Sequence, residues 1–169
     1  MRFSNYSITD EVKRGVEGLG FNKPTDIQFK SIPSILKGED VLGIAQTGTG
    51  KTAAFAIPIV HKVQIQSIKG RRDGVRCLVM VPTRELAQQV ADVAKLLIGY
   101  KSGINIALLV GGSSIKNQLD RLKKRPKIIV GTPGRINDLI TRGSLSLKHF
   151  NYFVLDEADR MLDMGFGIQ

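Results

Sequence analysis

The chain has 169 residues, 42% of them hydrophobic and 6% aromatic, which suits one domain with its own core. It carries 25 Lys and Arg against 15 Asp and Glu, and this net charge of +10 favours a polyanionic partner such as nucleic acid. A generally basic surface without such a partner is the alternative. The single cysteine, Cys77, excludes an internal disulfide, and its apolar neighbours predict a buried thiol. Residues 1–8 lack the apolar core of a signal peptide and no stretch is long enough to span a membrane, so we expect a cytoplasmic protein.

Helical patterns and short apolar runs follow one another along the chain. Two amphipathic patterns come first, over residues 9–19 and 25–36. The near-continuous apolar runs that follow are typical of parallel strands covered on both faces, and they lie at 41–45, 77–81, 104–110, 127–131 and 152–156. The helical patterns between them cover 51–65, 84–98, 114–124 and 133–141, and residues 69–74 are expected to form an exposed loop. This order predicts an α/β fold with a mostly parallel central sheet, helices on both faces, and ligands at the carboxyl ends of the strands.

The loop after the first apolar run has the composition of a triphosphate-binding loop. Its sequence is Ala45-Gln46-Thr47-Gly48-Thr49-Gly50-Lys51-Thr52, with Ala45 where the strict pattern has glycine. Two glycines allow the backbone N–H groups to turn towards phosphate oxygens, and the following helix adds the positive end of its dipole. Lys51 is expected to reach the β- and γ-phosphates, and Thr52 to help hold Mg²⁺.

A cluster of carboxylates follows the last apolar run, in the segment Asp156-Glu157-Ala158-Asp159. Asp156 is placed to coordinate Mg²⁺ through water, because Mg²⁺ gives up its hydration shell reluctantly. Glu157 is placed to orient or deprotonate an attacking water. A glutamate directly after the metal-binding aspartate favours hydrolysis over transfer of a phosphoryl group to a second substrate. We therefore expect Asp156, Glu157 and Lys51 to be the catalytic residues.

With these motifs the chain resembles the first RecA-like lobe of a DEAD-box ATP-dependent RNA helicase, over residues 3 to about 166. Residues 20–28 resemble the Q motif of that family. The resemblance implies that Gln28 reads the adenine edge, that Phe3 stacks on the adenine ring, and that Thr25 supports the loop. An amide with one donor and one acceptor on a single plane does match the N6/N7 edge of adenine. The remaining nucleotide contacts would come from Gln46, Thr47, Gly48, Thr49, Gly50, Lys51 and Thr52.

Three further motifs stand where an apolar run meets a helix, and in the family these carry contacts to the RNA backbone. Such junctions offer free N–H groups, a hydroxyl or an arginine to phosphates. The residues are Pro82, Thr83 and Arg84, then Gly111 and Gly112, then Thr132, Pro133, Gly134 and Arg135. The basic clusters at 69–72 and 121–127 fit solvated faces better than a direct RNA site.

The resemblance implies a RecA-like P-loop NTPase fold, with residues 1–169 forming one ATP-binding lobe that lacks its C-terminal part. The second helicase lobe, with its arginine finger, is absent from this sequence, so we expect the chain to bind ATP and Mg²⁺ with little or no hydrolysis. A DNA-directed helicase or translocase lobe and a non-catalytic nucleotide-binding module are the alternatives. A guanine-reading switch is disfavoured, because Asn22-Lys23-Pro24-Thr25 lacks the aspartate that such a motif needs.

Overall fold

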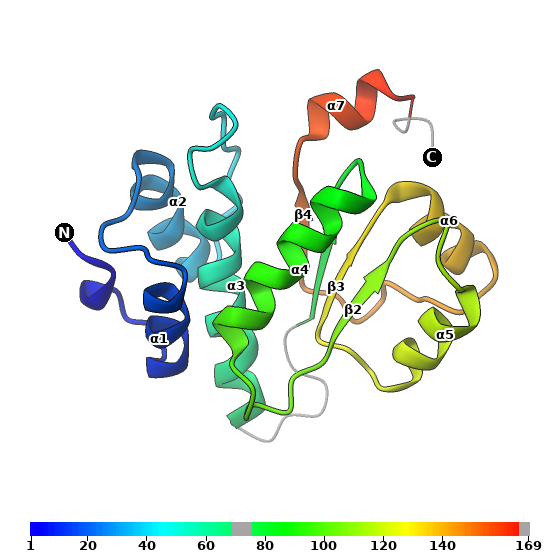
Figure 1. The fold of residues 1–169 in the computed structure, drawn as a ribbon, viewed down its shortest axis with the longest axis horizontal. Coiled ribbons are helices and arrows are strands. Elements are labelled where there is room, and N and C mark those ends of the chain that lie inside the picture. Colours follow the sequence, from blue (N-terminus) through cyan, green and yellow to red (C-terminus); the bar gives the residue numbers. More distant parts are fainter. Residues whose placement is uncertain (69–75, 166–169) are drawn as a thin grey trace. The chain divides into compact units, whose positions relative to one another are not determined.

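The computed structural model describes residues 1–68 and 76–165, so the expected loop at 69–74 lies outside the described residues. The chain separates into two compact units, Met1–Arg72 with Asp92–Gly103, and Asp73–Ala91 with Ile104–Gln169. Figure 1 shows the fold and labels its helices α1–α7 and three of its strands. The elements are η1 (Phe3–Asn5), α1 (Asp10–Gly18), α2 (Asp26–Lys37), α3 (Lys51–Ile68), β1 (Cys77–Met80), α4 (Arg84–Ile98), β2 (Ile106–Leu109), α5 (Ile115–Lys123), β3 (Ile128–Gly131), α6 (Pro133–Thr141), β4 (Tyr152–Leu155) and α7 (Ala158–Asp163).

The first unit is helical and contains η1, α1, α2, α3 and the C-terminal part of α4. Helix α1 begins at Thr9, whose side chain accepts a hydrogen bond from the N–H of Val12, and two acidic residues in its first turn suit the helix dipole. Close packing holds α1 against the C-terminal end of α4. A Cβ added to Gly15 would lie 2.7 Å from both Leu96 O and Leu97 Cα, so only glycine fits there.

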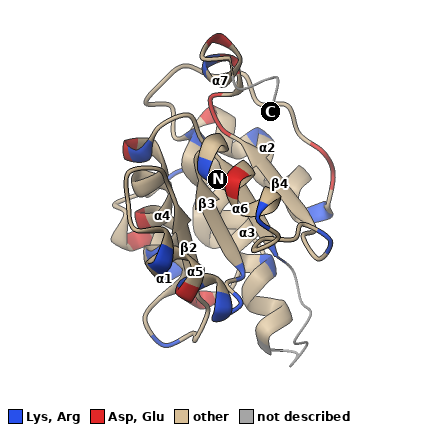
Figure 2. Cartoon of the chain, turned by 90° about the vertical axis from the view of Figure 1, so that its right-hand side faces the viewer, with Lys and Arg blue, Asp and Glu red and all other residues tan. Residues whose placement is uncertain are grey.

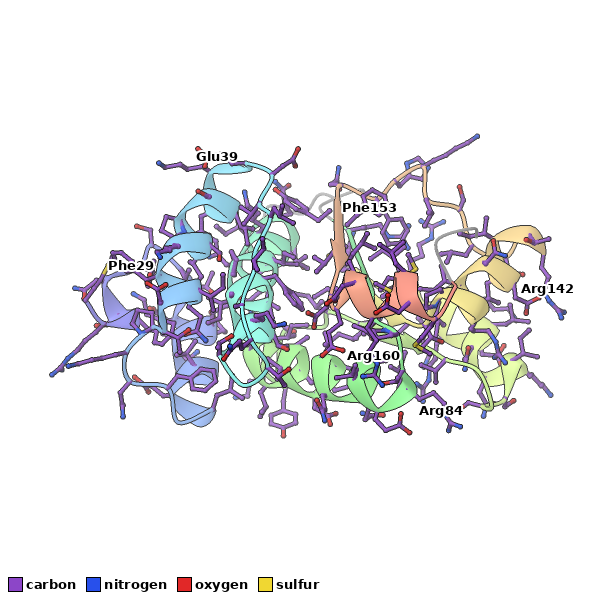
Figure 3. All side chains as sticks on the ribbon, turned by 90° about the horizontal axis from the view of Figure 1, so that it is seen from above. Phe29, Glu39, Arg84, Arg142, Phe153 and Arg160 are labelled. Atoms are coloured by element: carbon purple, nitrogen blue, oxygen red, sulfur yellow. The ribbon has the colours of Figure 1, made fainter. Side chains whose placement is uncertain are left out.

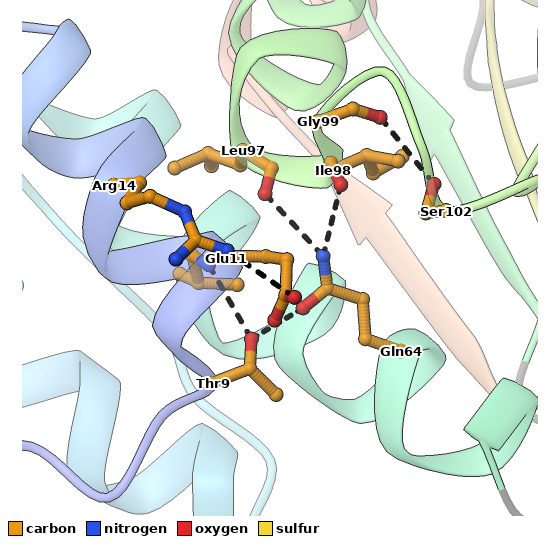
Figure 4. Close-up of polar contacts among 9 residues, drawn as sticks. Thr9, Glu11, Arg14, Gln64, Leu97, Ile98, Gly99 and Ser102 are labelled. Carbon is orange, nitrogen blue, oxygen red and sulfur yellow. Dashed lines mark hydrogen bonds and ion pairs between the residues drawn. The ribbon is translucent and has the colours of Figure 1, made fainter.

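A buried amide ties three helices of this unit together (Figure 4). Gln64 on α3 is 4% exposed, and its Nε2 donates to Ile98 O at 3.1 Å and to Leu97 O at 3.5 Å. Its Oε1 accepts a hydrogen bond from the Thr9 hydroxyl at the start of α1. The N–H of Thr9 in turn donates to Nδ1 of His61, also on α3. The two bonds from Gln64 Nε2 satisfy carbonyls at the end of α4 that no helical N–H can reach.

The second unit is built on a four-stranded, all-parallel sheet with the order β2-β3-β1-β4. Leu78 pairs with Ile129 on one side and with Phe153 on the other, so these residues share one face of the sheet. The opposite face is also buried, at Cys77, Val79, Ile128 and Val130. Burial of both faces is the reason for the near-continuous apolar runs in the sequence.

Helices α5 and α6 pack on the face that carries Leu78 and Ile129. Their contacts form one apolar core with Ala107 and Leu109 of β2, into which Ile136 and Leu139 of α6 insert, with Leu119 of α5 packed against it. Strand β4 is an edge strand, and its Phe153 and Leu155 are 57% and 58% exposed. The predicted α/β class and parallel sheet are therefore confirmed.

The predicted strand at 41–45 is wrong. No strand forms there, and Leu42 and Ile44 are 89% and 88% exposed. A strand exists only where a neighbouring backbone supplies hydrogen-bond partners, and no described strand pairs with this segment. An apolar run indicates that the side chains prefer burial, but it does not supply a neighbouring strand for the backbone to pair with. The other predicted strands and helices are present, with ends that differ by up to three residues.

The thiol of Cys77 is fully buried, as predicted, and burial raises its pKa to about 12. Among the described residues, no helix is long and apolar enough to cross a membrane. Lys and Arg lie on many elements and are not confined to one of them (Figure 2).

Candidate functional site

The phosphate loop, residues 46–50, lies in the first unit and leads directly into α3 at Lys51. Gly48 and Gly50 have φ values of +81° and +82°, which side chains rarely adopt, so the two glycines are required by the backbone itself. The Thr49 hydroxyl donates to Gln46 O at 2.6 Å and closes the turn. Lys51 therefore stands on the first turn of a helix whose N-terminal N–H groups lack helical partners.

The Q motif is bonded directly to this loop within the same unit. Gln28 on α2 is 1% exposed; its Oε1 accepts the Thr25 N–H, and its Nε2 donates to Gly50 O, each at 3.0 Å. The Thr25 hydroxyl donates to Thr49 O at 2.8 Å. A Cβ on Gly50 would lie 2.3 Å from Gln28 Nε2, so the amide occupies the space that any other residue at position 50 would need. The Q motif thus fixes the shape of the phosphate loop.

Phe3, expected to stack on adenine, is 4% exposed on η1. Its ring is stacked with Phe21 at a centroid distance of 6.3 Å and lies tilted against Tyr6 at 6.1 Å. The Tyr6 hydroxyl is buried with no hydrogen-bond partner among the described residues. The structure therefore places Phe3 in an aromatic cluster that anchors the N-terminal segment, and its contact with adenine stays a prediction.

The acidic cluster lies in the second unit, at the end of β4. The N–H of Asp156 donates to Met80 O at 3.0 Å and continues the ladder to β1. Glu157 follows in the left-handed conformation, with φ 55° and ψ 46°, and caps the short helix α7. Its carboxylate pairs with Arg160 at 3.4 Å, a residue labelled in Figure 3. A non-glycine residue in this backbone region costs roughly 1–2 kcal/mol, so Glu157 is held in a strained position directly after the strand.

A groove of about 540 Å³ lies at the carboxyl ends of β1, β2 and β3 in the second unit. It brings together seven of the nine residues predicted to contact RNA, and its lining comprises Pro82, Thr83, Arg84, Glu85, Gly111, Thr132, Gly134, Arg135 and Asp138. Arg84 projects from the first turn of α4 (Figure 3). A Cβ on Gly112 would lie 2.6 Å from Nη1 of Arg84, so this glycine adjoins the groove. Pro133, the ninth residue, is buried as the first residue of α6.

The strands fix this groove by short backbone contacts. The N–H of Thr132 donates to Leu109 O at 3.1 Å, which ties the exit of β3 to the end of β2. A Cβ on Gly131 would lie 2.4 Å from the same carbonyl, so this position admits only glycine. The Thr83 hydroxyl accepts the N–H of Leu86 at 3.3 Å and caps α4. The groove is thus formed where two helix N-termini and three strand ends meet.

Comparison with known proteins then decides the family. The model of the DEAD/DEAH box helicase family matches residues 25–169. The chain belongs to this family. It is 49% identical over 164 residues to the DEAD-box ATP-dependent RNA helicase CshA of Geobacillus kaustophilus, covering 97% of this chain and 34% of that protein. It is 46% identical over 167 residues to a probable ATP-dependent RNA helicase of Methanocaldococcus jannaschii, covering 98% and 43%.

Solved structures of the family give the same result. A DEAD-box protein from the hyperthermophile Methanococcus jannaschii matches with a TM-score of 0.88 and 45% identity, over 98% of this chain and 44% of that chain. A hypothetical ATP-dependent RNA helicase from Sulfolobus tokodaii matches with a TM-score of 0.83 and 36% identity, over 95% and 45%. The sheet and helices of this DEAD-box chain are therefore those of a RecA-like domain, and the chain spans less than half the length of these relatives.

The donor atoms of this DEAD-box chain suit Mg²⁺. The predicted ligands are the hydroxyl of Thr52 and the carboxylate of Asp156, and oxygen ligands are those that Mg²⁺ prefers. Thr52 lies on α3 in the first unit and Asp156 follows β4 in the second. Among the described residues, no group of three or more His, Cys, Asp or Glu side chains could hold a metal ion.

Three features of these motifs were missed from the sequence. The bond from Gln28 Nε2 to Gly50 O has no signal of its own, because the capping-box pattern of a threonine followed three residues later by glutamine indicates only the bond between the Thr25 N–H and Gln28 Oε1. Glu85 and Asp138, both lining the groove, carry no signal either. Asp138 is paired with Arg142 at 2.9 Å, so its charge is largely compensated inside the second unit.

Proposed function

We propose that this chain is the ATP-binding lobe of an ATP-dependent RNA helicase, which works with a second lobe to separate short RNA duplexes. The relatives named above are RNA helicases more than twice as long as this chain, which leaves room for that lobe. The observation that carries the proposal is the pair of hydrogen bonds from Gln28 and Thr25 to the phosphate loop. They join a candidate adenine reader to a candidate phosphate site within one compact unit.

In the nucleotide site, Lys51 binds the β- and γ-phosphates together with the N-terminal N–H groups of α3. Thr52 and Asp156 are the residues that would hold Mg²⁺, and the bound ion would neutralise charge on the phosphate oxygens. The Gln28 amide keeps one N–H and one lone pair beyond the two bonds it makes here, which is the number that the N6/N7 edge of adenine requires. Because Gln28 is 1% exposed, adenine recognition requires this amide to become accessible when the nucleotide binds.

In the RNA site, the groove at the strand ends binds the sugar-phosphate backbone. Arg84 and Arg135 supply positive charge, and the N-termini of α4 and α6 supply backbone N–H groups. These groups recognise phosphates and carry no base-specific pattern, so binding is expected to depend on salt and not on sequence. RNA and ATP together close the two lobes, and hydrolysis by a water that Glu157 orients reopens them.

The test compares this chain with a longer protein that includes the second lobe. Steady-state ATP hydrolysis is measured with and without single-stranded RNA, and displacement of a short RNA duplex is measured in parallel. We expect RNA-stimulated hydrolysis and displacement only in the longer protein, because an arginine supplied from outside can contribute roughly 10³–10⁵ in rate. Full activity of the chain alone would contradict the assignment to one lobe, and equal stimulation by DNA would favour a DNA-directed translocase. A cytoplasmic location stays a prediction.

A further inference from the structure

Gln118 on α5 is one of few buried polar side chains among the described residues, at 4% exposed. Its Nε2 donates to Val110 O at 2.8 Å, at the exit of β2. Its Oε1 accepts a hydrogen bond from Nη1 of Arg135 at 3.1 Å. Gln118 is not among the residues that line the groove, but its partner Arg135 is. A buried amide with both ends bonded defines the positions of its partners, because losing either bond leaves a buried polar group unsatisfied.

The second partner of Arg135 is a backbone carbonyl just before α5. Nη1 of Arg135 also donates to Ser113 O at 3.2 Å, directly after the two glycines of the GG element. The guanidinium is therefore held at one nitrogen by two acceptors, one on the segment that joins β2 to α5 and one on α5 itself. Its Nη2 and Nε make no hydrogen bond within the part of the chain that the structure describes. These two nitrogens form the flat pair of donors that a phosphate accepts side by side.

We propose that Gln118 is a positioning residue for RNA binding: it clamps Nη1 of Arg135 and so presents the other guanidinium nitrogens to an RNA phosphate. The inference rests on the proposed function of the groove. An arginine on a mobile side chain loses rotamer freedom when it binds, which weakens the contact. Because Gln118 restricts the Arg135 side chain before RNA binds, less rotamer entropy is lost on binding. The bond from Gln118 to Val110 O fixes the amide at the end of β2 and so ties its position to the sheet.

An amide suits this position better than the residues of similar size. Glutamate would keep the bond to Arg135, but its carboxylate would repel Val110 O because it has no N–H to donate. Its negative charge would also neutralise the positive charge of the guanidinium. Methionine would fill the same space with neither a donor nor a strong acceptor. Gln118→Met therefore removes the amide's bond to Arg135 with little change in volume and leaves Nη1 with Ser113 O alone.

The chain offers a matched control in Gln64. This amide is also 4% exposed and also donates to backbone carbonyls, but it belongs to the first unit and is not among the residues that line the groove. Gln64→Met removes a buried amide at a similar cost in stability. Thermal unfolding of both variants shows whether each is folded at the assay temperature.

The experiment measures affinity for a fluorescein-labelled oligouridine by anisotropy, for wild type, Gln118→Met, Gln64→Met, Arg135→Ala and the double variant Gln118→Met/Arg135→Ala. We expect Gln118→Met to weaken binding roughly 2- to 10-fold, the effect of one hydrogen bond, and Gln64→Met to leave it unchanged. In the Arg135→Ala background, Gln118→Met should have no further effect. A second loss of the same size there, or an equal loss in Gln64→Met, would overturn the positioning role.

A readout without RNA separates this inference from the proposed function. The Nε–H signal of Arg135, assigned by its loss in Arg135→Ala, is followed by ¹⁵N NMR relaxation in the free chain. We expect an ordered signal in wild type and a mobile one in Gln118→Met. Equal mobility in both refutes the clamp whatever the RNA result. An ordered Arg135 in a chain that binds no RNA would instead refute the function proposed for the groove.

Discussion

Replacing Gly50 by alanine tests how the Q motif shapes the phosphate loop. The backbone at Gly50 has a φ of +82°, and the new Cβ would lie 2.3 Å from Gln28 Nε2 and 3.4 Å from Thr25 Oγ1. Gly48 is a matched control, because its φ is +81° and an added Cβ would meet nothing within 4 Å. Both alanine variants carry the backbone cost of roughly 1–2 kcal/mol. Only Gly50→Ala also displaces the Gln28 amide from Gly50 O.

The displaced Gln28 amide determines how much the nucleotide affinities of Gly50→Ala and Gly48→Ala should differ. Leaving a buried polar group unsatisfied costs about 1–3 kcal/mol, so Gly50→Ala should bind a fluorescent adenine nucleotide roughly 5- to 150-fold more weakly than Gly48→Ala. Adding Gln28→Ala to each variant removes the clash and should bring the two affinities together. Equal affinities of Gly48→Ala and Gly50→Ala with Gln28 present would refute the reasoning.

Three other predictions concern packing, pH and hydrolysis. Gly15→Ala should lower the melting temperature because the added Cβ meets the backbone of α4 at 2.7 Å, whereas Gly18→Ala, with open space, should leave it unchanged or raise it. Burial lowers the pKa of His61, whose Nδ1 accepts the Thr9 N–H. Neutral His61 therefore contributes its full share of the folding stability above about pH 6.5, and this share is lost as the pH falls through the lowered pKa of the folded state. Below about pH 6.5, the melting temperature should fall more steeply in wild type than in His61→Gln. Glu157→Gln in the longer protein should keep ATP affinity and stop hydrolysis; continued turnover would exclude Glu157 as the base.

Most elements could be predicted because their sequence signals are local. Helix α6 begins at Pro133 and ends at Thr141, as its amphipathic pattern and N-terminal proline indicate. The segment 41–45 was mispredicted because an apolar run does not specify which backbone will pair with it. The same reason explains the exposed edge of β4, whose Phe153 is as apolar as residues of the central strands.

The candidate sites were predictable in composition but not in their connections. Lys51, Glu157 and Arg135 could be selected from motif and position alone. The bonds from Gln28 to Gly50 and from Gln118 to Arg135 join residues 22 and 17 positions apart, and both depend on how the helices pack. A buried glutamine carries no mark in the sequence that separates it from a solvated one. The residues that hold the motif side chains in place are therefore set by tertiary packing, and the motifs do not reveal them.

The most direct test of the central claim is a titration of this chain with a fluorescent adenine nucleotide and Mg²⁺, competed with ATP, ADP and GTP. If the Q motif and phosphate loop form one adenine-nucleotide site, ATP and ADP will displace the probe, GTP will not, and Lys51→Ala will abolish binding. Equal displacement by GTP, or unchanged affinity in Lys51→Ala, would contradict the account.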